Sequence, residues 1–411
     1  MAIDAKIHRL VENFDPWSIE LANDAELFWA VINGIREHGP VLYSERHGGF
    51  WVIAGYDEVL RATKDWKTFS SAQGAAVPAN PDLPKLAPIE VDPPDHSDWR
   101  RILNPLMSHA AVSRHESAMR RIASALMDEF IEVGECDLVK DFAERFVPGA
   151  LFELMLGVPG DQLPTTHALV QSFISSAGRS SQQEAFTQLT MWAEQFLLWR
   201  KEQPERGDVT DALLRGDVRG VPLTMDQMVS TLVMLVLAGM ETTASGISHI
   251  AQHLAFDPEL CRDLASSKAQ TDLVIDEIMR RESVSFGLAR VTTRDVEIGG
   301  QLIPEGSRVF LLWAAANWDP NVFPTPERID IRRPRNKHLA FGTGPHKCMG
   351  QHFAKLLLKV ATTEIATRMP DLQLRPGAAA EHQPGLTRVT RSLPVLFRPT
   401  RRLGHPKVLT K

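Results

Sequence analysis

The chain has 411 residues, 45 Lys and Arg against 51 Asp and Glu, and a formal net charge of -6. A hydrophobic share of 44% and a charged share of 23% exclude general disorder, and without a basic excess the chain lacks the electrostatic footprint of a nucleic-acid-binding protein. The three cysteines, Cys136, Cys261 and Cys348, cannot form a disulfide framework, which favours a reducing cytosol.

Neither the start of the chain nor its apolar runs indicates a membrane protein. Residues 1–10 are polar and charged and lack the apolar core of a signal peptide. The longest strongly apolar run, 232–240, is too short to span a bilayer. We therefore expect a soluble, cytoplasmic protein without a membrane partner.

The N-terminal part of the chain predicts helices, a pair of strands and a long loop. The predicted elements are a helix over 17–38, strands over 41–44 and 50–54 around a turn at Gly48-Gly49, and a helix from Asp57. Residues 70–95 hold six prolines and show no clear periodicity. Such a segment is usually a lid or a binding loop, and a floppy excursion is the alternative.

The rest of the chain is mainly helical, with a small β region before its last helix. Helical patterns cover most of 99–250, with predicted breaks at Gly134, Pro148, Pro159, Pro164 and 206–208, and another helical region reaches Glu282. Strands are predicted over 291–303, around a turn at Gly299-Gly300, and over 309–313; an irregular meander follows over 318–340, and a last helix covers 349–368. This order predicts an α+β fold class, mainly α with small β-sheets, and argues against a doubly wound fold.

The most informative segment is 341–350, which reads Phe-Gly-Thr-Gly-Pro-His-Lys-Cys-Met-Gly. It lacks the third glycine of a dinucleotide fingerprint and the Gly-Lys-Ser/Thr of a phosphate loop, and too few cysteines lie nearby for structural zinc. What remains is Cys348 at the start of a helix, where backbone N–H groups and the helix dipole favour a thiolate. A thiolate in an apolar, glycine-rich loop suits an axial ligand of haem iron, and an inert buried cysteine is the alternative.

This segment resembles the haem-binding signature of the cytochrome P-450 superfamily, Phe-Gly-x-Gly-x-His-x-Cys-x-Gly, and matches it at every fixed position. Other motifs of the family follow in the right order over essentially the whole chain. The resemblance implies a single cytochrome P-450 haem domain over 1–411, with a long central helix over a buried haem b (iron protoporphyrin IX) and no fused reductase or ferredoxin. It makes Cys348 the metal ligand and Phe341, Gly342, His346 and Gly350 haem-binding residues.

A long central helix is predicted to begin after a capping box at 224–227 and to reach 256, just before Asp257-Pro258. Its middle, Ala-Gly-Met-Glu-Thr-Thr, is a poor helix sequence, which often marks a functional site. The alternative is a glycine for close helix packing beside a solvent-facing glutamate. The stretch resembles the family's oxygen-activating motif, in which the groove residues are Ala238 and Gly239, the proton-managing pair is Glu241 and Thr242, and Thr243 is the weaker candidate for the alcohol.

A further family motif concerns the fold rather than the chemistry. Glu277 and Arg280 lie three positions apart on a predicted helix, a spacing that by itself indicates a common surface pair. In the family the pair is buried and bonds an arginine of the meander, for which Arg333 has the best spacing. The chain departs from the family's pattern nearby, because Arg281 stands where an aromatic residue is common and Trp318 stands where a basic residue is frequent.

Haem propionates need cationic partners, and several residues match the family's positions for them. Residues 92–101 resemble the family's His-x-x-x-Arg element, so His96 and Arg100, one helical turn apart, are expected to bind one propionate. Arg290, His338 and His346 match other propionate-binding positions. The alternative for each of these residues is an ordinary surface side chain.

The substrate pocket is expected to be apolar. Its variable elements are expected in the proline-rich loop, 165–190, the central helix, 284–289 and the turn at 386–390. The inward candidates are Phe286, Leu288, Ala289 and Val389, and both tyrosines of the chain lie outside these segments. Few polar side chains are therefore expected in the pocket, which favours a lipophilic substrate of the terpenoid, steroid or aromatic class that binds by shape complementarity.

The resemblance implies a haem-thiolate monooxygenase that activates dioxygen and hydroxylates this substrate. Electrons are expected from separate partners, a ferredoxin and an NAD(P)H-dependent ferredoxin reductase. We expect the acidic partner to dock on Arg100, Arg101, Lys347 and Lys355, with a merely solvated basic patch as the alternative. A peroxide-driven hydroxylase and a non-catalytic haem-binding carrier or sensor are the competing functions, and the Glu241-Thr242 pair argues against both because neither needs protons for dioxygen.

Overall fold

A computed structural model describes residues 2–175, 179–378 and 380–404. The chain divides into two compact units, and each unit draws on three separate chain segments. Unit 1 comprises Met1–Asn80, Ala269–Cys348 and Ala380–Arg391, and unit 2 comprises Pro81–Lys268, Met349–Ala379 and Ser392–Lys411. The expectation of one haem domain over 1–411 stays a prediction.

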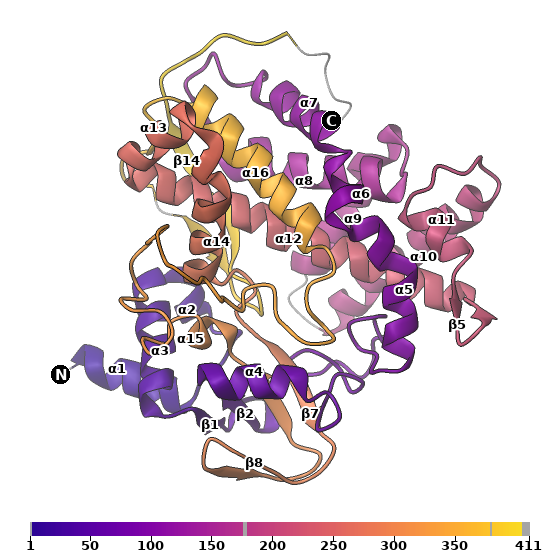
Figure 1. Ribbon diagram of the computed structural model, residues 1–411, viewed down its shortest axis with the longest axis vertical. Helices are drawn as coiled ribbons and strands as arrows, with labels where there is room; N and C mark the ends of the chain where they lie inside the picture. Colours follow the sequence, from indigo (N-terminus) through magenta and orange to yellow (C-terminus); the bar gives the residue numbers. More distant parts are fainter. Residues whose placement is uncertain (1, 176–178, 379, 405–411) are drawn as a thin grey trace. The chain divides into compact units, whose positions relative to one another are not determined.

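Unit 1 is built on a five-stranded sheet with the order β1-β2-β10-β7-β3 (Figure 1). The strands are β1 (Val41–Ser44), β2 (Phe50–Ile53), β10 (Arg308–Leu311), β7 (Leu288–Thr292) and β3 (Phe69–Ser70). Strands β2 and β10 run parallel, and the other neighbours are antiparallel. The sheet therefore joins the N-terminal strands to strands from the last third of the chain.

Both faces of this sheet are buried within unit 1. Val52 and Phe310 are partners in the register and belong to the apolar cluster that contains residues of α3 (Ala25–His38). Their neighbours Ile53 and Leu311 are also partners and belong to the cluster on the α4 side (Tyr56–Lys64). Because successive strand side chains point to opposite faces, the same two strands supply both cores.

The remaining elements of unit 1 follow the predicted order with small corrections. They are α1 (Ala2–Glu12), α2 (Ile19–Asn23), η1 (Arg46–Gly48), η5 (Lys268–Gln270, whose first residue belongs to unit 2), α14 (Thr271–Glu282), β8 (Val296–Ile298), β9 (Gln301–Ile303), α15 (Trp313–Ala316), β12 (Glu381–Gln383) and β13 (Val389–Ser392). The helix predicted over 17–38 is two helices, since the Asp24 side chain accepts a hydrogen bond from the Leu27 N–H and caps α3. The strand predicted over 309–313 ends at Leu311, because Trp313 begins α15.

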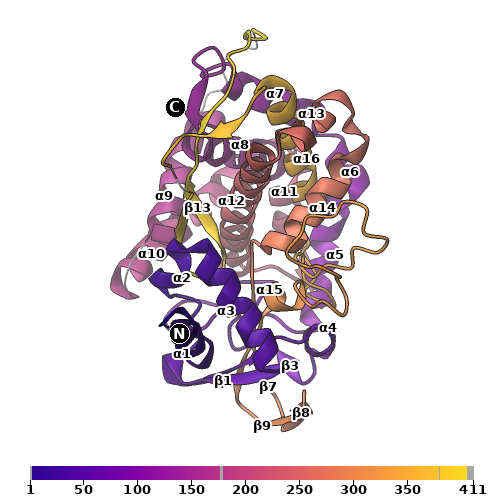
Figure 2. The same ribbon diagram turned by 90° about the vertical axis from the view of Figure 1, so that its left-hand side faces the viewer.

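Unit 2 is a helical body around α12 (Met225–Phe256) (Figure 2). Its other helical elements are α5 (Asp95–Met107), α6 (His109–Ser113), α7 (Glu116–Met127), η2 (Leu138–Ala143), α8 (Glu144–Ala150), η3 (Leu151–Leu156), η4 (Gly160–Gln162), α9 (Leu163–Ser175), α10 (Arg179–Lys201), α11 (Val209–Leu214), α13 (Pro258–Ser266) and α16 (Gln351–Arg368). Its strands are β4 (Glu135–Asp137), β5 (Asp217–Val218), β6 (Val221–Pro222), β11 (Gln373–Leu374) and β14 (Pro394–Leu396). Helices α8, α10 and α16 pack against α12, so α12 is the core helix of this unit.

The predicted limits of α12 are confirmed. The Gln227 N–H donates to Thr224 Oγ1 at 3.3 Å, and the Thr224 N–H donates to Gln227 Oε1 at 2.9 Å, which completes the capping box. Asp257 ends the helix and caps α13, which begins at Pro258. By length and composition α12 could cross a membrane, but 67% of its most apolar stretch is buried inside the protein, so this is weak evidence for a membrane segment.

Two predicted breaks were wrong. Pro164 lies inside α9, but in its first turn, where a helix does not use the backbone N–H that proline lacks. Pro148 lies inside α8, which is flanked on both sides by π-helical turns, η2 and η3. These wider turns shift the hydrogen-bond register, which allows the helical path to continue past the proline.

The Glu277–Arg280–Arg333 cluster is confirmed and is buried in unit 1. Arg280 donates to both Glu277 carboxylate oxygens at 2.8 and 3.0 Å, and Arg333 Nε donates to Oε1 at 2.8 Å. Asn336 Nδ2 and the Asp330 N–H complete the shell at 3.0 Å each. The Glu277 carboxylate therefore binds side chains of both α14 and the meander.

The two departures from the family's pattern lie against each other. The Arg281 guanidinium is 5.6 Å from the centroid of the Trp318 ring and 5.9 Å from that of Trp29, and the two tryptophan rings stack at 4.3 Å. The Trp318 indole N–H also donates to the Arg281 carbonyl at 2.9 Å. The Arg281 cation thus lies against the faces of both tryptophan rings, a cation–π arrangement at the two positions that depart from the family's pattern.

We predict that Glu277→Gln destabilises the protein by about 3–5 kcal/mol, because it leaves the buried Arg280 and Arg333 cations without their anion. Urea unfolding of the wild type and variant measures this loss. The matched control is Glu116→Gln, which removes the carboxylate from an exposed pair with Arg120 and should cost about 0–1 kcal/mol. Equal losses in the two variants would contradict a special role for the buried cluster.

Candidate functional site

The candidate ligand Cys348 ends a loop whose backbone is closed by hydrogen bonds. The Cys348 N–H donates to the Phe341 carbonyl at 2.8 Å, and the Gly342 N–H donates to the Leu339 carbonyl at 2.8 Å. Cys348 is partly exposed and forms no disulfide, whereas burial raises the pKa of the thiols of Cys136 and Cys261. Cys348 is therefore the accessible thiol of the three.

The glycines of this loop meet two different requirements. Gly342 and Gly344 adopt φ values of +62° and +67°, in the left-handed region that glycine favours. A Cβ on Gly344 would lie 2.6 Å from the backbone carbonyl oxygen of Thr63 on α4, whereas one on Gly342 would make only ordinary contacts, with the Trp313 ring at 3.7 Å and the His346 carbonyl oxygen at 3.8 Å. Close approach to α4 thus explains Gly344.

Asn317 connects the cysteine loop to the buried cluster of unit 1. The Leu339 N–H donates to Asn317 Oδ1 at 2.6 Å, and Asn317 Nδ2 donates to Ser283 Oγ at 2.8 Å. Arg280 Nη1 donates to the Asn317 backbone carbonyl at 2.9 Å. Sequence analysis assigned no role to Asn317, although its neighbour Trp318 stands at a position where the chain departs from the family's pattern.

The predicted cations of unit 1 are buried or half-buried, not surface side chains. Arg290 is 2% exposed on β7, and its Nη1 donates to the Ala289 carbonyl at 2.6 Å. The Ala340 N–H donates to His338 Nδ1 at 3.2 Å, so a neutral His338 carries its proton on Nε2, which lies 3.7 Å from Asp276 Oδ1. His346 is half-buried in the cysteine loop.

Two of the predicted pocket segments lie side by side. The Phe286 N–H donates to the Leu386 carbonyl at 3.2 Å, and the Arg388 N–H donates to the Val284 carbonyl at 2.8 Å. Of the four inward candidates, Leu288 is half-buried, and Phe286, Ala289 and Val389 are buried. The Phe286 ring lies 5.5 Å from Phe28 and 6.1 Å from Phe310, centroid to centroid, so much of it belongs to the core. Of the segment expected over 165–190, residues 176–178 lie outside the described residues.

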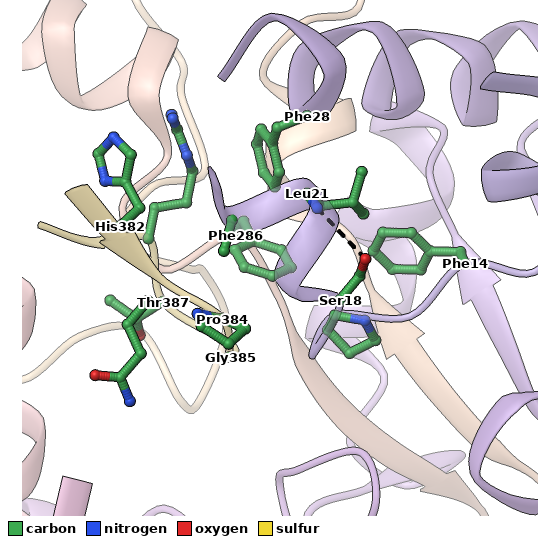
Figure 3. A pocket seen from close by; sticks show the side chains of 13 residues that line it. Phe14, Ser18, Leu21, Phe28, Phe286, His382, Pro384, Gly385 and Thr387 are labelled. Carbon is green, nitrogen blue, oxygen red and sulfur yellow. Dashed lines mark hydrogen bonds between the residues drawn. The ribbon is translucent and has the colours of Figure 1, made fainter. Parts of the chain in front are cut away.

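Beside these segments unit 1 holds a cavity that is partly open to solvent (Figure 3). Phe14, Leu21, Phe28 and Phe286 are among its apolar lining residues, and His382 and Arg388 are among its polar ones. Burial, and then the charge of Arg388, lower the pKa of His382 to about 4, so its ring is neutral at pH 7. Arg388 Nη1 donates to Glu282 Oε2 at 2.7 Å. Sequence analysis missed His382 and Arg388, which carry no motif.

In unit 2 the acid Glu241 does not face solvent. Glu241 belongs to α12 and is only 8% exposed. Its Oε1 accepts a hydrogen bond at 3.3 Å from Gln171 Nε2 on α9. Gln171 Nε2 also lies 3.4 Å from His167 Nε2, one turn earlier on α9. Burial lowers the pKa of His167, which favours its neutral form. The sequence held no signal for this pairing of two helices.

The residues around Glu241 serve both packing and chemistry. Thr242 Oγ1 donates to the Ala238 carbonyl at 2.7 Å, and α12 continues without a break through this stretch. Thr242 is partly exposed, whereas Thr243 is 5% exposed. A Cβ on Gly239 would lie 3.1 Å from Leu151 Cδ2, so close packing is part of the reason for this glycine.

His96 and Arg100 lie on one side of α5, as predicted. His96 is 3% exposed, and burial lowers its pKa to about 4, with a further decrease from the Arg100 charge that Asp92 opposes. The imidazole is therefore neutral at pH 7 and can donate one hydrogen bond, while Arg100 keeps a positive charge.

Part of the predicted docking cluster is locally neutralised. Arg101 Nη2 donates to Asp217 Oδ1 at 3.0 Å, and Arg101 Nε lies 3.5 Å from Asp98 Oδ1. The exposed Lys347 belongs to unit 1, whereas Arg100, Arg101 and Lys355 belong to unit 2. Partner docking on these four residues stays a prediction.

The residues of unit 1 fit a haem better than a bare metal ion. Within residues 2–175, 179–378 and 380–404, no group of three or more His, Cys, Asp and Glu side chains could hold a metal ion by itself. A thiol outside any disulfide suits an iron whose other ligands come from a macrocycle, and a buried guanidinium and an imidazole suit carboxylate groups. Cys348, Arg290 and His338 provide these three kinds of group.

Comparisons with known proteins point in the same direction. The family model for cytochrome P450 matches residues 269–368. A protein named probable cytochrome P450 127A1, from Sinorhizobium fredii, is 30% identical over 358 residues, which cover 85% of this chain and 85% of the relative. A steroid C26-monooxygenase from Mycobacterium tuberculosis is 30% identical over 388 residues, which cover 91% of this chain and 95% of the relative.

Solved structures confirm the predicted fold class. HmtN, a post-tailoring hydroxylase involved in himastatin biosynthesis, has a TM-score of 0.82 at 26% identity, with 92% of this chain and 98% of the other covered. CYP108D1 from Novosphingobium aromaticivorans has a TM-score of 0.86 at 24% identity, with 96% and 99% covered.

We predict that Gly344→Ala destabilises the protein more than Gly306→Ala, by about 1–3 kcal/mol, because only the first adds a clash with backbone. Both glycines have positive φ, +67° and +77°, and a Cβ on Gly306 would meet nothing within 4 Å. The Gly306 variant therefore isolates the cost of the left-handed backbone, about 1–2 kcal/mol. Urea unfolding measures both variants, and equal losses would show that the loop does not press against α4.

Proposed function

Because this chain belongs to the cytochrome P450 family and is a haem-dependent monooxygenase, we propose that Cys348 is the proximal ligand of haem b. The observation that carries this proposal is the accessible thiol of Cys348 at the end of the hydrogen-bonded signature loop. When bound, the haem supplies the oxidising chemistry on dioxygen, and the polypeptide supplies the ligand, the orientation and the protons.

The remaining haem contacts follow from charge and from small side chains. We propose that the propionates are bound by His96, Arg100, Arg290, His338 and His346. Burial of Arg290 and the single proton of neutral His96 support hydrogen bonds to carboxylates in an apolar setting. The residues proposed to contact the macrocycle are Ala238, Gly239, Phe341, Gly342 and Gly350. At Gly350 a Cβ would lie in open space, with no atom beyond its chain neighbours within 4 Å.

Glu241 and Thr242 are proposed to manage protons for dioxygen. The Glu241 carboxylate is buried and accepts a hydrogen bond from an amide, so it can hold a proton without breaking an ion pair with that partner. Thr242 gives its hydroxyl hydrogen to the Ala238 carbonyl, which leaves the lone pairs of Oγ1 able to accept a hydrogen bond. The two residues thus give this stretch of α12 an acid that can hold a proton and an alcohol that can accept a hydrogen bond.

The substrate is proposed to be a lipophilic small molecule of the terpenoid, steroid or aromatic class, hydroxylated at a C–H bond. The apolar character of Phe286, Leu288, Ala289 and Val389 supports this class. One relative is named a steroid C26-monooxygenase, and another is named an epothilone C/D epoxidase, so large apolar substrates occur among similar proteins.

Electrons are proposed to come from a separate ferredoxin and an NAD(P)H-dependent ferredoxin reductase in the cytoplasm. The exposed Lys347 and the half-buried Lys355 are the cations proposed to attract an acidic partner, together with Arg100, whereas the carboxylates of Asp217 and Asp98 offset Arg101.

We predict that Cys348→His abolishes the thiolate type of spectrum in the reduced, carbon monoxide-bound protein, because imidazole replaces sulfur as the ligand. The absorbance spectrum of the purified haem-loaded variant is the measurement. The control is Cys261→Ala, which removes a buried thiol outside the signature and should leave the spectrum unchanged. A thiolate-type spectrum in the Cys348 variant would refute the assignment.

We predict that Thr242→Ala keeps haem and substrate binding but lowers the product formed per NAD(P)H by about tenfold or more, because a proton-transfer group is lost. Product, NAD(P)H and peroxide are measured together with a surrogate ferredoxin and reductase. Thr243→Ala is the comparison, and stronger uncoupling in that variant would move the role to Thr243. Wild-type turnover with peroxide but not with electron donors would instead favour the peroxide-driven hydroxylase.

A further inference from the structure

The acid of α12 is held by a side-chain relay from α9, the helix Leu163–Ser175. We propose that Gln171 and His167 are positioning residues that set the orientation of the Glu241 carboxylate through one amide group. This inference rests on the proposed role of Glu241 in managing protons. It assigns to two residues of α9 a part in the reaction that neither their sequence pattern nor the signature motifs indicate.

The geometry requires the nitrogen end of the Gln171 amide to face both neighbours. Gln171 Nε2 lies 3.3 Å from Glu241 Oε1 and 3.4 Å from His167 Nε2. This nitrogen carries two hydrogens, one for each acceptor. With the amide reversed, an oxygen would face the carboxylate oxygen, an unfavourable contact unless Glu241 were protonated. An ionised Glu241 therefore selects the orientation of the amide.

The same arrangement selects one tautomer of His167. If Gln171 donates to Nε2, that nitrogen is without a proton, and a neutral ring must carry its proton on Nδ1. Burial lowers the pKa of His167, which agrees with a neutral ring. His167 and Gln171 are four residues apart on α9 and so share one face of the helix, where the imidazole can hold the amide in place.

The consequence for Glu241 is a donor on a defined side of its carboxylate. A neutral amide favours the ionised carboxylate less strongly than a guanidinium or ammonium group would, and it orients the carboxylate as well. The amide thus holds Oε1 in place without itself fixing the protonation state of the acid. Losing the amide leaves the buried carboxylate with one donor fewer and allows it to take up another orientation.

The tautomer of His167 tests the relay without relying on turnover. Nitrogen-15 NMR of histidine-labelled protein, in the diamagnetic reduced carbon monoxide form at pH 7.5, reports which ring nitrogen carries the proton. The signal lost in His167→Gln assigns the residue. We expect the Nδ1–H tautomer in the wild type and a shift toward the Nε2–H tautomer, which a free imidazole favours, in Gln171→Leu.

Coupling measurements then test the effect on the reaction. Gln171→Leu should lower the product formed per NAD(P)H by about tenfold, the effect of losing one hydrogen bond to a charged group. Gln188→Leu on α10 makes the same chemical change at an exposed position of unit 2 and should leave both the tautomer and the coupling unchanged.

The outcomes separate this inference from the proposed function. An Nε2–H tautomer in the wild type overturns the relay whatever the turnover shows. The expected tautomer with unchanged coupling in Gln171→Leu, while Thr242→Ala uncouples, overturns the positioning role and leaves the proposed function standing. Unchanged coupling in both variants overturns the proton role of the acid–alcohol pair, and the positioning role with it.

Discussion

The buried carboxylate of Glu277 is the interaction on which the arrangement of unit 1 depends. A carboxylate without exposure to water is costly unless every oxygen is bound, and here two guanidinium groups, an amide and a backbone N–H bind it. These partners come from α14 and from the meander over 318–340, which contains no helix or strand. Arg280 then reaches the Asn317 carbonyl, and Asn317 holds the start of the cysteine loop. One satisfied charge thus orders a long irregular segment that ends at the thiol.

The contacts of Arg281 and Trp318 show how the two departures from the family's pattern are accommodated. Trp318 places its ring face beside the Arg281 guanidinium and donates its indole N–H to the Arg281 carbonyl. Arg281 is also an ion-pair partner of Glu282, which in turn binds Arg388 at the cavity of unit 1. The change in residue type is therefore absorbed by contacts that remain favourable.

The acidic and basic groups of the candidate site are controlled mainly by burial. His96, His167 and His382 have lowered pKa values because desolvation disfavours their charged forms, so each serves as a neutral hydrogen-bonding group at pH 7. Arg290 keeps its charge because a guanidinium is not deprotonated in proteins, even when buried. Burial therefore leaves neutral imidazoles in both units, and Arg290 is a permanent cation of unit 1 that suits carboxylates.

The sequence by itself determined the features that depend on neighbours along the chain. The capping box at Thr224 and the Asp257-Pro258 end define α12, the alternating strands and their glycine turns define the sheet, and the ten-residue signature identifies the thiol. Local rules were wrong at Pro148 and Pro164, because the cost of a proline depends on the turn that contains it and on the π-helical turns around it. Only the tertiary structure decided which residues far apart in the chain are in contact. These are Thr63 with Gly344, Asn317 with Leu339 at the start of the cysteine loop, and Gln171 with Glu241. These contacts join residues far apart in sequence, and their energies depend on distance and burial, which residue order alone does not specify.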